Sequence, residues 1–310
     1  MLNSARITCD FLGLQPGDTA LLCMPLDYIA GKMVVVRSLE RRMHLLSVTP
    51  SGHPLSDASL SQLAVPDEEI TFAAMVPLQV YNSLQIPEEN ERLRRIRHLI
   101  IGGGAIDERL AEALHDFPHA VWSTYGMTET LSHIALRRLN GPDASDWYRP
   151  FDGVKTRLDS DGCLVIDAPA VCPGTLVTND RAELRSYGRQ DNATASCFRI
   201  LGRKDNVIDS GGIKIQIEEV EHRLRSRLTG GFAITSCPDE QFGEAVVLLT
   251  TQTDTCAVKA LCRQCLPKYW QPRHIFHTAT IPQTDTGKPA RAEIKAVSLR
   301  LYKNIAAEAA

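Results

Sequence analysis

The stretch AVWSTYGMTET, residues 120–130, is an apolar run that passes directly into a polar loop containing glycine. Two further apolar runs, at 20–26 and 96–101, also end in loops rich in Gly, Pro or Ser. Short apolar runs bounded by turn residues are typical of buried strands in a layered α/β domain. A helix is predicted between two of these runs, at 107–116. We therefore expect an α/β fold for the first part of the chain.

The composition excludes several classes of protein. The 310 residues are 44% hydrophobic and 23% charged, which is ordinary globular usage, and a chain of this length usually forms about two domains. The net charge of −3 argues against a nucleic-acid binder that relies on positive charge. No apolar run approaches the ~18 residues that span a bilayer, and nine scattered cysteines favour reduced thiols. We expect a cytoplasmic protein that binds neither nucleic acid nor membrane.

The sequence becomes β-rich near residue 150. The stretch RPFDGVKTRLDSDGCLVIDAPAV, residues 149–171, predicts two strands joined by a turn at 159–162. The β-rich character continues to residue 200. We expect a β-rich subdomain that belongs to a large N-terminal domain, residues 1–203.

The character of the sequence changes a second time after GRKD, residues 202–205. The next stretch, SGGIKIQIEEVEHRLRSRL, opens with a glycine pair and becomes an amphipathic helix. Its apolar face consists of Ile217, Val220, Leu224 and Leu228. Further strands are predicted at 232–236, 245–251 and 274–279, and helices at 257–266 and 291–299. These elements suffice for a separate small α+β domain, residues 206–310.

The loop in TYGMTET carries groups that suit a ligand site. Gly126 allows close backbone approach, Thr128 offers a hydroxyl group, and the Glu129 carboxylate suits a hard cation. The carboxyl edge of a sheet is where α/β proteins bind ligands. The alternative is a polar loop in which Thr128 caps a helix.

Four further segments each give only weak evidence of a ligand site when they are considered alone. GGG at 102–104 is bare backbone on which a flat ring or a phosphate could lie, and TND places Asp180 at a strand end, where it could bind ribose hydroxyls. GRKDNVIDSGG, residues 202–212, puts a cation, an acid and a glycine pair at the domain boundary. TDTGKPAR presents Lys288 on a Gly-Pro loop, where a lysine is usually a solvated charge.

Taken in this order, the segments resemble the adenylate-forming superfamily of acyl-CoA synthetases, peptide-synthetase adenylation domains and luciferases. The resemblance runs from about Gly17 to Leu299, and YGMTE and GR-x-D…GG-x-K-I are its specific motifs. It implies an ATP-dependent and Mg²⁺-dependent ligase. Such an enzyme activates a small carboxylic acid as acyl-AMP and transfers it to coenzyme A.

The resemblance also implies roles in the large domain. Gly103, Gly104 and Ala105 would lie against adenine, with Tyr125 stacked on the ring and Gly126 beside it. These five residues would bind the base of the nucleotide.

The phosphates and the ribose would be bound by the next motifs. Thr128 would bind the α-phosphate and Glu129 would hold Mg²⁺. Asp180 would take the ribose hydroxyls, helped by Arg203.

The resemblance also implies roles for residues of the small domain, which is expected to change its orientation between the two half-reactions. Asp205 would be the hinge, and Lys288 the lysine of the adenylation step. Gly211 and Gly212 would line the path of the CoA pantetheine in the thioester-forming arrangement. The small domain is therefore expected to be mobile.

The acyl pocket is expected beside MPLDYIAGKMVVVRSL, residues 24–39, where Tyr28 replaces the histidine of many members. The run YGMTETLSHIAL is most similar to the o-succinylbenzoate–CoA ligases of menaquinone biosynthesis. Ser132 and His133 would then lie close to the acyl pocket and hydrogen-bond a keto acid. The alternative is that both are polar residues on a helix surface.

The chain departs from the superfamily in one motif. The phosphate loop of the type SGTTG-x-PK is nowhere in these residues, so the chain is expected to start after the family's N-terminal part. Two other functions stay open. One is a non-catalytic remnant that binds acyl-adenylate or CoA, and the other is an adenylation domain that loads a carrier protein.

Overall fold

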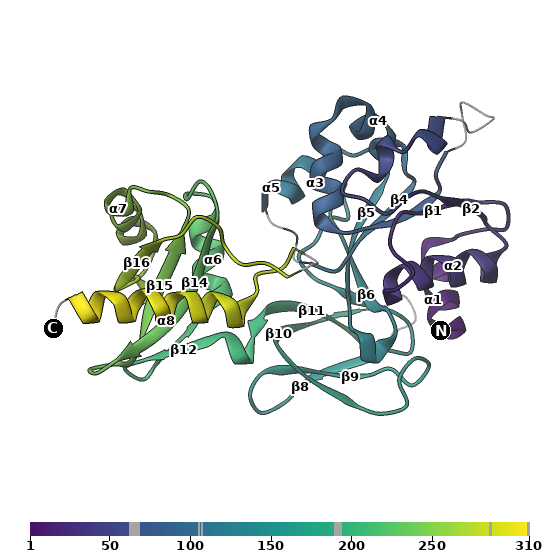
Figure 1. Ribbon diagram of the computed structural model, residues 1–310. Helices are drawn as coiled ribbons and strands as arrows, with labels where there is room; N and C mark the ends of the chain where they lie inside the picture. Colours follow the sequence, from purple (N-terminus) through teal and green to yellow (C-terminus); the bar gives the residue numbers. More distant parts are fainter. Residues whose placement is uncertain (62–68, 105, 107, 189–193, 285–286, 309–310) are drawn as a thin grey trace. The chain divides into compact units, whose positions relative to one another are not determined.

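The structure is a computed structural model that describes residues 1–61, 69–104, 106, 108–188, 194–284 and 287–308. It contains two compact units (Figure 1). The first comprises Met1–Ser160, Leu164–Thr178 and Glu183–Arg199, and the second Asp161–Cys163, Asn179–Ala182 and Ile200–Ala310. The predicted hinge at Asp205 and the mobility of the small domain stay predictions.

The first unit contains a seven-stranded sheet in the order β2-β1-β3-β4-β5-β6-β7. The first five of these strands are parallel, and β6 and β7 are antiparallel. The strands are β1 (Thr19–Leu22), β2 (His44–Ser47), β3 (Phe72–Met75), β4 (His98–Ile101), β5 (Ala120–Gly126), β6 (His133–Arg138) and β7 (Arg149–Pro150). The helices are α1 (Leu2–Leu12), α2 (Ile29–Arg41), α3 (Pro77–Gln85), α4 (Pro87–Arg95) and α5 (Glu108–Leu114). The expected α/β class is confirmed.

The three predicted apolar strands are β1, β4 and β5. Their side chains are buried in one core together with β3. The strand predicted at 20–26 is too long, because β1 ends at Leu22. Pro25 lacks the N–H group that a ladder requires. Because β1, β3, β4 and β5 are parallel, their carboxyl ends lie along one edge of the sheet.

The β-rich subdomain is a four-stranded sheet in the order β11-β10-β9-β8. Its strands are β8 (Lys155–Leu158), β9 (Cys163–Asp167), β10 (Leu176–Gly188) and β11 (Thr194–Arg203). The predicted turn at 159–162 joins β8 to β9. Asp180 was expected at a strand end, and this is wrong: it lies inside β10. Pairing with neighbouring strands overrides the turn preference of Asn and Asp.

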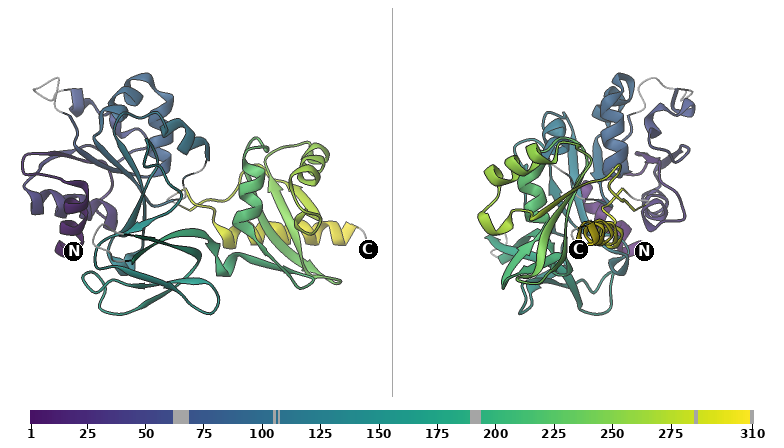
Figure 2. Two further views of the ribbon diagram at one scale, coloured as in Figure 1. Left: turned by 180° about the vertical axis from the view of Figure 1, so that it is seen from behind. Right: turned by 60° about the vertical axis from the view of Figure 1, so that its left-hand side comes forward.

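The second unit has a five-stranded sheet with helices on both faces (Figure 2). In β15, Val246 and Leu248 face a core shared with α6 and α7, whereas Val247 and Leu249 face a core shared with α8. This alternation follows from the two-residue period of a strand. The elements are β12 (Val207–Ser210), β13 (Ile213–Gln216), α6 (Ile217–Arg225), β14 (Phe232–Asp239), β15 (Gly243–Thr250), α7 (Thr255–Cys265), β16 (His274–His277) and α8 (Arg291–Glu308).

The glycine pair closes a hairpin and does not start a helix. β12 and β13 pair from Val207 with Gln216 to Ser210 with Ile213. Gly211 and Gly212, between them, have φ angles of 61° and 81°. A two-residue hairpin turn with two positive φ angles strongly favours glycine. Helix α6 starts only at the end of β13 and ends at Arg225, so it contains three of the four predicted apolar residues. Leu228 follows the helix, and all four residues are buried in one core.

All nine cysteines are free thiols. Among the described residues, no helix combines the length and the apolar character needed to cross a bilayer.

Candidate functional site

The glycine run after β4 lies against the end of β5. The Gly102 N–H donates to the Met75 carbonyl oxygen at 3.1 Å, which continues the pairing of β4 with β3. A Cβ atom on Gly102 would stand 2.5 Å from Thr124 Oγ1. The first glycine of the run is therefore required by packing against β5.

The next two glycines leave bare backbone at the same edge. Gly103 has a φ of 80°, and a Cβ atom on Gly104 would lie 3.3 Å from the Cγ of Pro77. A flat ring could lie on such backbone, so the strip fits an adenine base. Ala105, the third residue predicted for this strip, lies outside the described residues.

Tyr125, near the end of β5, belongs to an aromatic cluster. Its ring centroid lies 4.9 Å from that of Phe198 in an edge-to-face arrangement and 5.8 Å from that of Tyr148. Tyr148 and Phe198 stack on each other with an interplanar angle of 20°. These contacts fix the orientation of the Tyr125 ring. Its stacking on adenine stays a prediction.

Gly126 lies at an irregularity in the pairing of β5 with β6. A Cβ atom there would stand 2.3 Å from the Ser132 carbonyl oxygen and 2.4 Å from the His133 Cα. The close approach that the sequence indicated is therefore between two strands of the protein. The nucleotide role of Gly126 stays a prediction.

We expect Gly126→Ala to lower the free energy of unfolding by about 3 kcal/mol, because backbone atoms of β6 would have to move. Gly174→Ala is the matched control, since a Cβ atom there meets nothing within 4 Å. Urea denaturation of both variants measures the difference. Equal midpoints would contradict this packing argument.

Thr128 and Glu129 lie on a single 3-10 turn, Thr128–Thr130, directly after β5. The Thr130 hydroxyl accepts from the Met127 N–H at 3.1 Å and donates to the Ser132 carbonyl oxygen at 2.7 Å. The alternative that Thr128 caps a helix is wrong, because Met127 precedes the turn and no side chain caps it. Both Thr128 and Glu129 are exposed.

The Glu129 carboxylate fits a metal that is bound together with a nucleotide. No group of three His, Cys, Asp or Glu side chains able to hold a metal forms within the described part of the chain. Mg²⁺ is usually held by one or two carboxylates and by substrate phosphates. One exposed carboxylate beside a threonine hydroxyl suits that mode of binding.

Ser132 and His133 lie in a hydrogen-bond network that includes two residues the sequence did not indicate, Arg37 and Thr8. Arg37 Nη2 donates to Ser132 Oγ at 2.9 Å. Ser132 Oγ lies 3.3 Å from His133 Nδ1, and His133 Nε2 lies 3.0 Å from Thr8 Oγ1. The alternative that Ser132 and His133 lie on a helix surface is wrong, because His133 begins β6 and is buried.

The network assigns a neutral imidazole to His133. The Thr8 hydroxyl donates to the Ser4 carbonyl oxygen, so it accepts from His133 Nε2–H. The Ser132 hydroxyl accepts from Arg37 and therefore donates to His133 Nδ1. Burial, and secondly the Arg37 charge, hold the pKa of His133 well below its usual value of 6.5.

This histidine predicts a pH dependence of stability. The unfolded chain takes up a proton on His133 below pH ~6.5, whereas the folded chain does not. The free energy of unfolding therefore decreases as the pH is lowered through this range, by up to ~1.4 kcal/mol per pH unit. His133→Asn should remove this contribution, with exposed His44→Asn as the control. Denaturation curves at several pH values measure it, and an unchanged slope in His133→Asn would refute the assignment.

Arg37 is a buried cation without a carboxylate partner in the described part of the chain. Its exposed fraction is 2%, and its Nε has no hydrogen-bond partner. Burial lowers the pKa of Arg37 to about 10. At neutral pH the charged group therefore costs about 3 kcal/mol of stability. The sequence carried one signal of this feature, a single arginine inside the apolar run MVVVRSL.

Tyr28 does not join this network. It precedes the first residue of α2 and its exposed fraction is 54%. Arg37 lies nine residues later in the same helix, which is about 14 Å along the axis. The structure thus brings together Ser132 and His133 but places Tyr28 apart from them.

In the second unit, Arg203 contacts Asp180, the acid that it was predicted to assist, and also Asp205, the predicted hinge residue. Its Nε and Nη2 donate to the two carboxylate oxygens of Asp205 at 2.9 and 3.1 Å. Its Nη1 lies 3.5 Å from Asp180 Oδ1. The hydrogen bonds with Asp205 raise the pKa of Arg203 and lower that of Asp205. Ribose binding by Asp180 stays a prediction.

The turn formed by Gly211 and Gly212 contacts the loop before β15. The Gly211 N–H donates to the Phe242 carbonyl oxygen at 2.8 Å. A Cβ atom on Gly211 would stand 2.8 Å from the Phe242 ring, whereas one on Gly212 would meet nothing within 4 Å. The Gly212 side of the turn is therefore open, and its role in CoA binding stays a prediction.

Lys288 lies just before α8, and its backbone is hydrogen-bonded to Thr284. Its carbonyl oxygen accepts from the Thr284 N–H at 2.8 Å, and its N–H lies 3.2 Å from Thr284 Oγ1. Gly287 before it has a φ of 77°. The lysine is exposed, and no described carboxylate forms an ion pair with its ammonium group. These contacts with Thr284 fix the backbone of Lys288 within the second unit.

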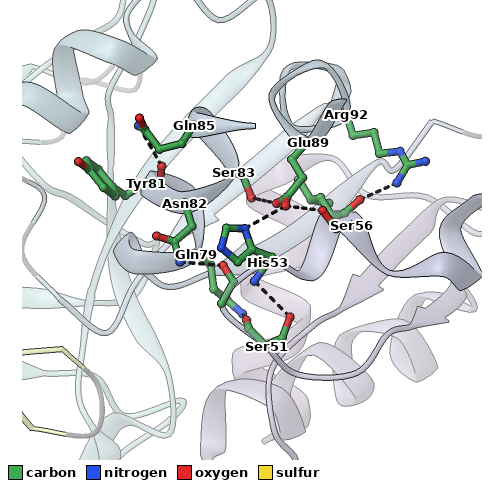
Figure 3. Close-up of polar contacts among 12 residues, drawn as sticks. Ser51, His53, Ser56, Gln79, Tyr81, Asn82, Ser83, Gln85, Glu89 and Arg92 are labelled. Atoms are coloured by element: carbon green, nitrogen blue, oxygen red, sulfur yellow. Dashed lines mark hydrogen bonds and ion pairs between the residues drawn. The ribbon is translucent and has the colours of Figure 1, made fainter. Parts of the chain in front are cut away.

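A buried carboxylate that the sequence did not indicate fixes a loop of the first unit (Figure 3). Glu89 has an exposed fraction of 1%, and it accepts from Ser56 Oγ at 2.5 Å, Ser83 Oγ at 2.7 Å and His53 Nδ1 at 3.0 Å. Gln79 Nε2 donates to the carbonyl oxygens of Ser51 and Cys23. The cluster thus holds residues 51–53 beside the ends of β1 and β3.

Comparison with known proteins identifies the family. A family model described as AMP-binding enzyme matches residues 1–178. The chain belongs to the AMP-binding enzyme family. Membership confirms the resemblance to adenylate-forming enzymes that YGMTE and the boundary motif indicated.

This AMP-binding enzyme is similar to 2-succinylbenzoate–CoA ligases. The one from Bacillus cereus (strain AH820) is 23% identical over 309 residues, which cover 92% of this chain and 62% of the relative. The one from Bacillus mycoides (strain KBAB4) is 24% identical over 311 residues, covering 92% and 63%. The chain thus spans less than two thirds of the length of these relatives.

Solved structures share the fold. An acyl-CoA synthetase (AMP-forming)/AMP-acid ligase II-like protein from Dyadobacter fermentans is 31% identical, with a TM-score of 0.58, covering 94% of this chain and 82% of that one. The o-succinylbenzoate CoA synthetase from Bacillus subtilis, in complex with the acyl-adenylate OSB-AMP, is 22% identical with a TM-score of 0.72, covering 95% and 65%.

Proposed function

We propose that this AMP-binding enzyme activates a dicarboxylic aromatic acid, o-succinylbenzoate, as its acyl-adenylate and transfers the acyl group to coenzyme A. One observation carries the choice of acid. Arg37 is a buried guanidinium that no described carboxylate neutralises, and it is hydrogen-bonded to Ser132, next to the turn that bears Thr128 and Glu129. Leaving such a charge unpaired is costly, so a ligand carboxylate is its natural partner.

The names of the relatives support the same acid. o-Succinylbenzoate has two carboxylates, of which one is activated and the other is available for Arg37. Ser132 and the neutral His133 would orient the guanidinium for that second carboxylate. A monocarboxylic acid would leave Arg37 without its partner.

The remaining residues take the roles that the family implies. Gly103 and Gly104 would lie against the base, and the Thr128 hydroxyl would contact the α-phosphate. Mg²⁺ bound through Glu129 would offset the negative charge of the phosphates. Lys288 would stabilise the charge that develops as pyrophosphate leaves, which is electrostatic stabilisation of a transition state.

ATP–pyrophosphate exchange in the presence of o-succinylbenzoate tests the proposal. It should be measured on this chain and on a longer form that adds an SGTTG-x-PK phosphate loop. We expect exchange that depends on o-succinylbenzoate from at least the longer form. Absence of exchange from both forms would refute the proposal and favour a non-catalytic protein that binds acyl-adenylate. Transfer to a carrier protein but not to CoA would favour the adenylation-domain alternative.

A further inference from the structure

The segment that bears Lys288 leads directly into a partly buried ion pair. Arg291, the first residue of α8, lies three residues after Lys288. Its Nη1 and Nη2 contact the two carboxylate oxygens of Glu221 in α6, both at 2.7 Å. The Glu221 side chain is 7% exposed and that of Arg291 is 25% exposed. A two-point pair of this kind fixes orientation as well as distance.

The same carboxylate is anchored to the sheet. Glu221 Oε1 accepts the Ile234 N–H of β14 at 2.9 Å. Arg291 Nη1 also approaches the Ile234 carbonyl oxygen at 3.4 Å. The start of α8 is therefore attached to α6 and to β14 at one point.

The chain between Arg291 and Lys288 is stiff. Pro289 has its φ angle fixed by its ring and restricts Lys288 to extended conformations. The Ala290 N–H donates to the Pro282 carbonyl oxygen at 3.0 Å, and Ala290 is buried. A displacement of the first turn of α8 would therefore move Lys288 with it.

We propose that Glu221 and Arg291 are positioning residues for Lys288: their pair fixes the start of α8 so that the loop presents the lysine ammonium group in the orientation the adenylation step requires. The inference rests on the proposed function, in which Lys288 acts in that step. A merely structural pair would stabilise the second unit and affect both half-reactions alike. A positioning pair affects the half-reaction that uses Lys288.

The variants must separate positioning from folding. Glu221→Gln and Arg291→Lys keep the size of each side chain and weaken the two-point contact. The double variant Glu221→Gln/Arg291→Met removes both charges and the two-point contact, but keeps an amide oxygen that can accept from the Ile234 N–H. Lys295→Met is the control, because Lys295 lies on α8 and pairs with Glu244 at 3.2 Å, away from the first turn.

Three measurements test the inference: acyl-adenylate formation, thioester formation from supplied acyl-adenylate, and hydrogen exchange of residues 282–284 and 287–294. For the double variant we expect adenylate formation to fall about 10- to 100-fold, the cost of a misplaced catalytic group, with less than about 2-fold change in thioester formation. The amide groups of Lys288 and Ala290 should exchange faster, while β14 and β15 keep their protection. Lys295→Met should change none of these.

Two outcomes would overturn the inference, and they are distinguishable. If Lys288→Ala lowers adenylate formation selectively but the double variant lowers both half-reactions equally or neither, the positioning role is wrong and the function of Lys288 stands. If Lys288→Ala itself affects both half-reactions equally, the proposed role of Lys288 is wrong, and the positioning role is refuted with it. Unchanged hydrogen exchange at Lys288 and Ala290 in the double variant would also refute the positioning role.

Discussion

Replacing Lys288 with alanine should lower the rate of acyl-adenylate formation about 10²- to 10³-fold, the usual cost of removing one preorganised charge-stabilising group. Thioester formation from supplied acyl-adenylate should change little, because no pyrophosphate leaves in that step. The loop around the lysine should keep its structure, since the Lys288 side chain is exposed. Rapid-quench assays of the two half-reactions measure the effect.

Lys303→Ala is the matched control for this experiment. Lys303 is another exposed lysine of the second unit, on α8. It should leave both half-reactions unchanged. A loss of the same size in both half-reactions of Lys288→Ala would show that the lysine is not specific to adenylation.

Replacing Arg37 with methionine should weaken binding of o-succinylbenzoate about 100-fold, because a buried charge pair with the second carboxylate would be lost. The same variant should be as stable as the natural protein or more stable. Its buried charge costs about 3 kcal/mol, and the hydrogen bonds that it makes to Ser132 and Thr8 offset this only in part. A gain in stability together with a loss of affinity is the mark of a binding residue.

The control variant for Arg37→Met is Lys32→Met, which removes an exposed charge from the same helix. Affinity for benzoylpropanoate, which lacks the ring carboxylate, provides the second comparison and should be similar in Arg37→Met and the natural protein. Calorimetric titration and thermal denaturation supply both readouts. A variant that loses stability but keeps its preference for the dicarboxylic acid would assign Arg37 a structural role only.

The sequence predicted the parts of the fold that depend on local pattern. The runs that became β1, β4 and β5 were visible as short apolar stretches, and the buried face of α6 as helical spacing. It failed where pairing between distant segments overrides local preference. Asp180 lies inside β10 although its neighbours favour a turn, and the residues after Gly212 form a strand although they precede a helix.

The residues of the candidate site that belong to a sequence motif could be predicted. The residues whose role depends on burial in the folded core could not. YGMTE directed attention to Thr128 and Glu129, which are exposed on one turn. The importance of Arg37 depends on the absence of a described carboxylate around it, and that is a property of the folded core. Likewise, the contact between Glu221 and Arg291 joins residues 70 positions apart, and no local pattern indicates it.

The most direct test is a calorimetric titration of the chain with two acyl-adenylates, that of o-succinylbenzoate and that of benzoylpropanoate. We predict one binding site, with the o-succinylbenzoyl adenylate bound about 100-fold more tightly, and loss of this preference in Arg37→Met. This measurement requires neither ATP nor a phosphate loop. Equal affinity for the two adenylates, or no binding of either, would contradict the assignment of a dicarboxylate-activating site to this protein.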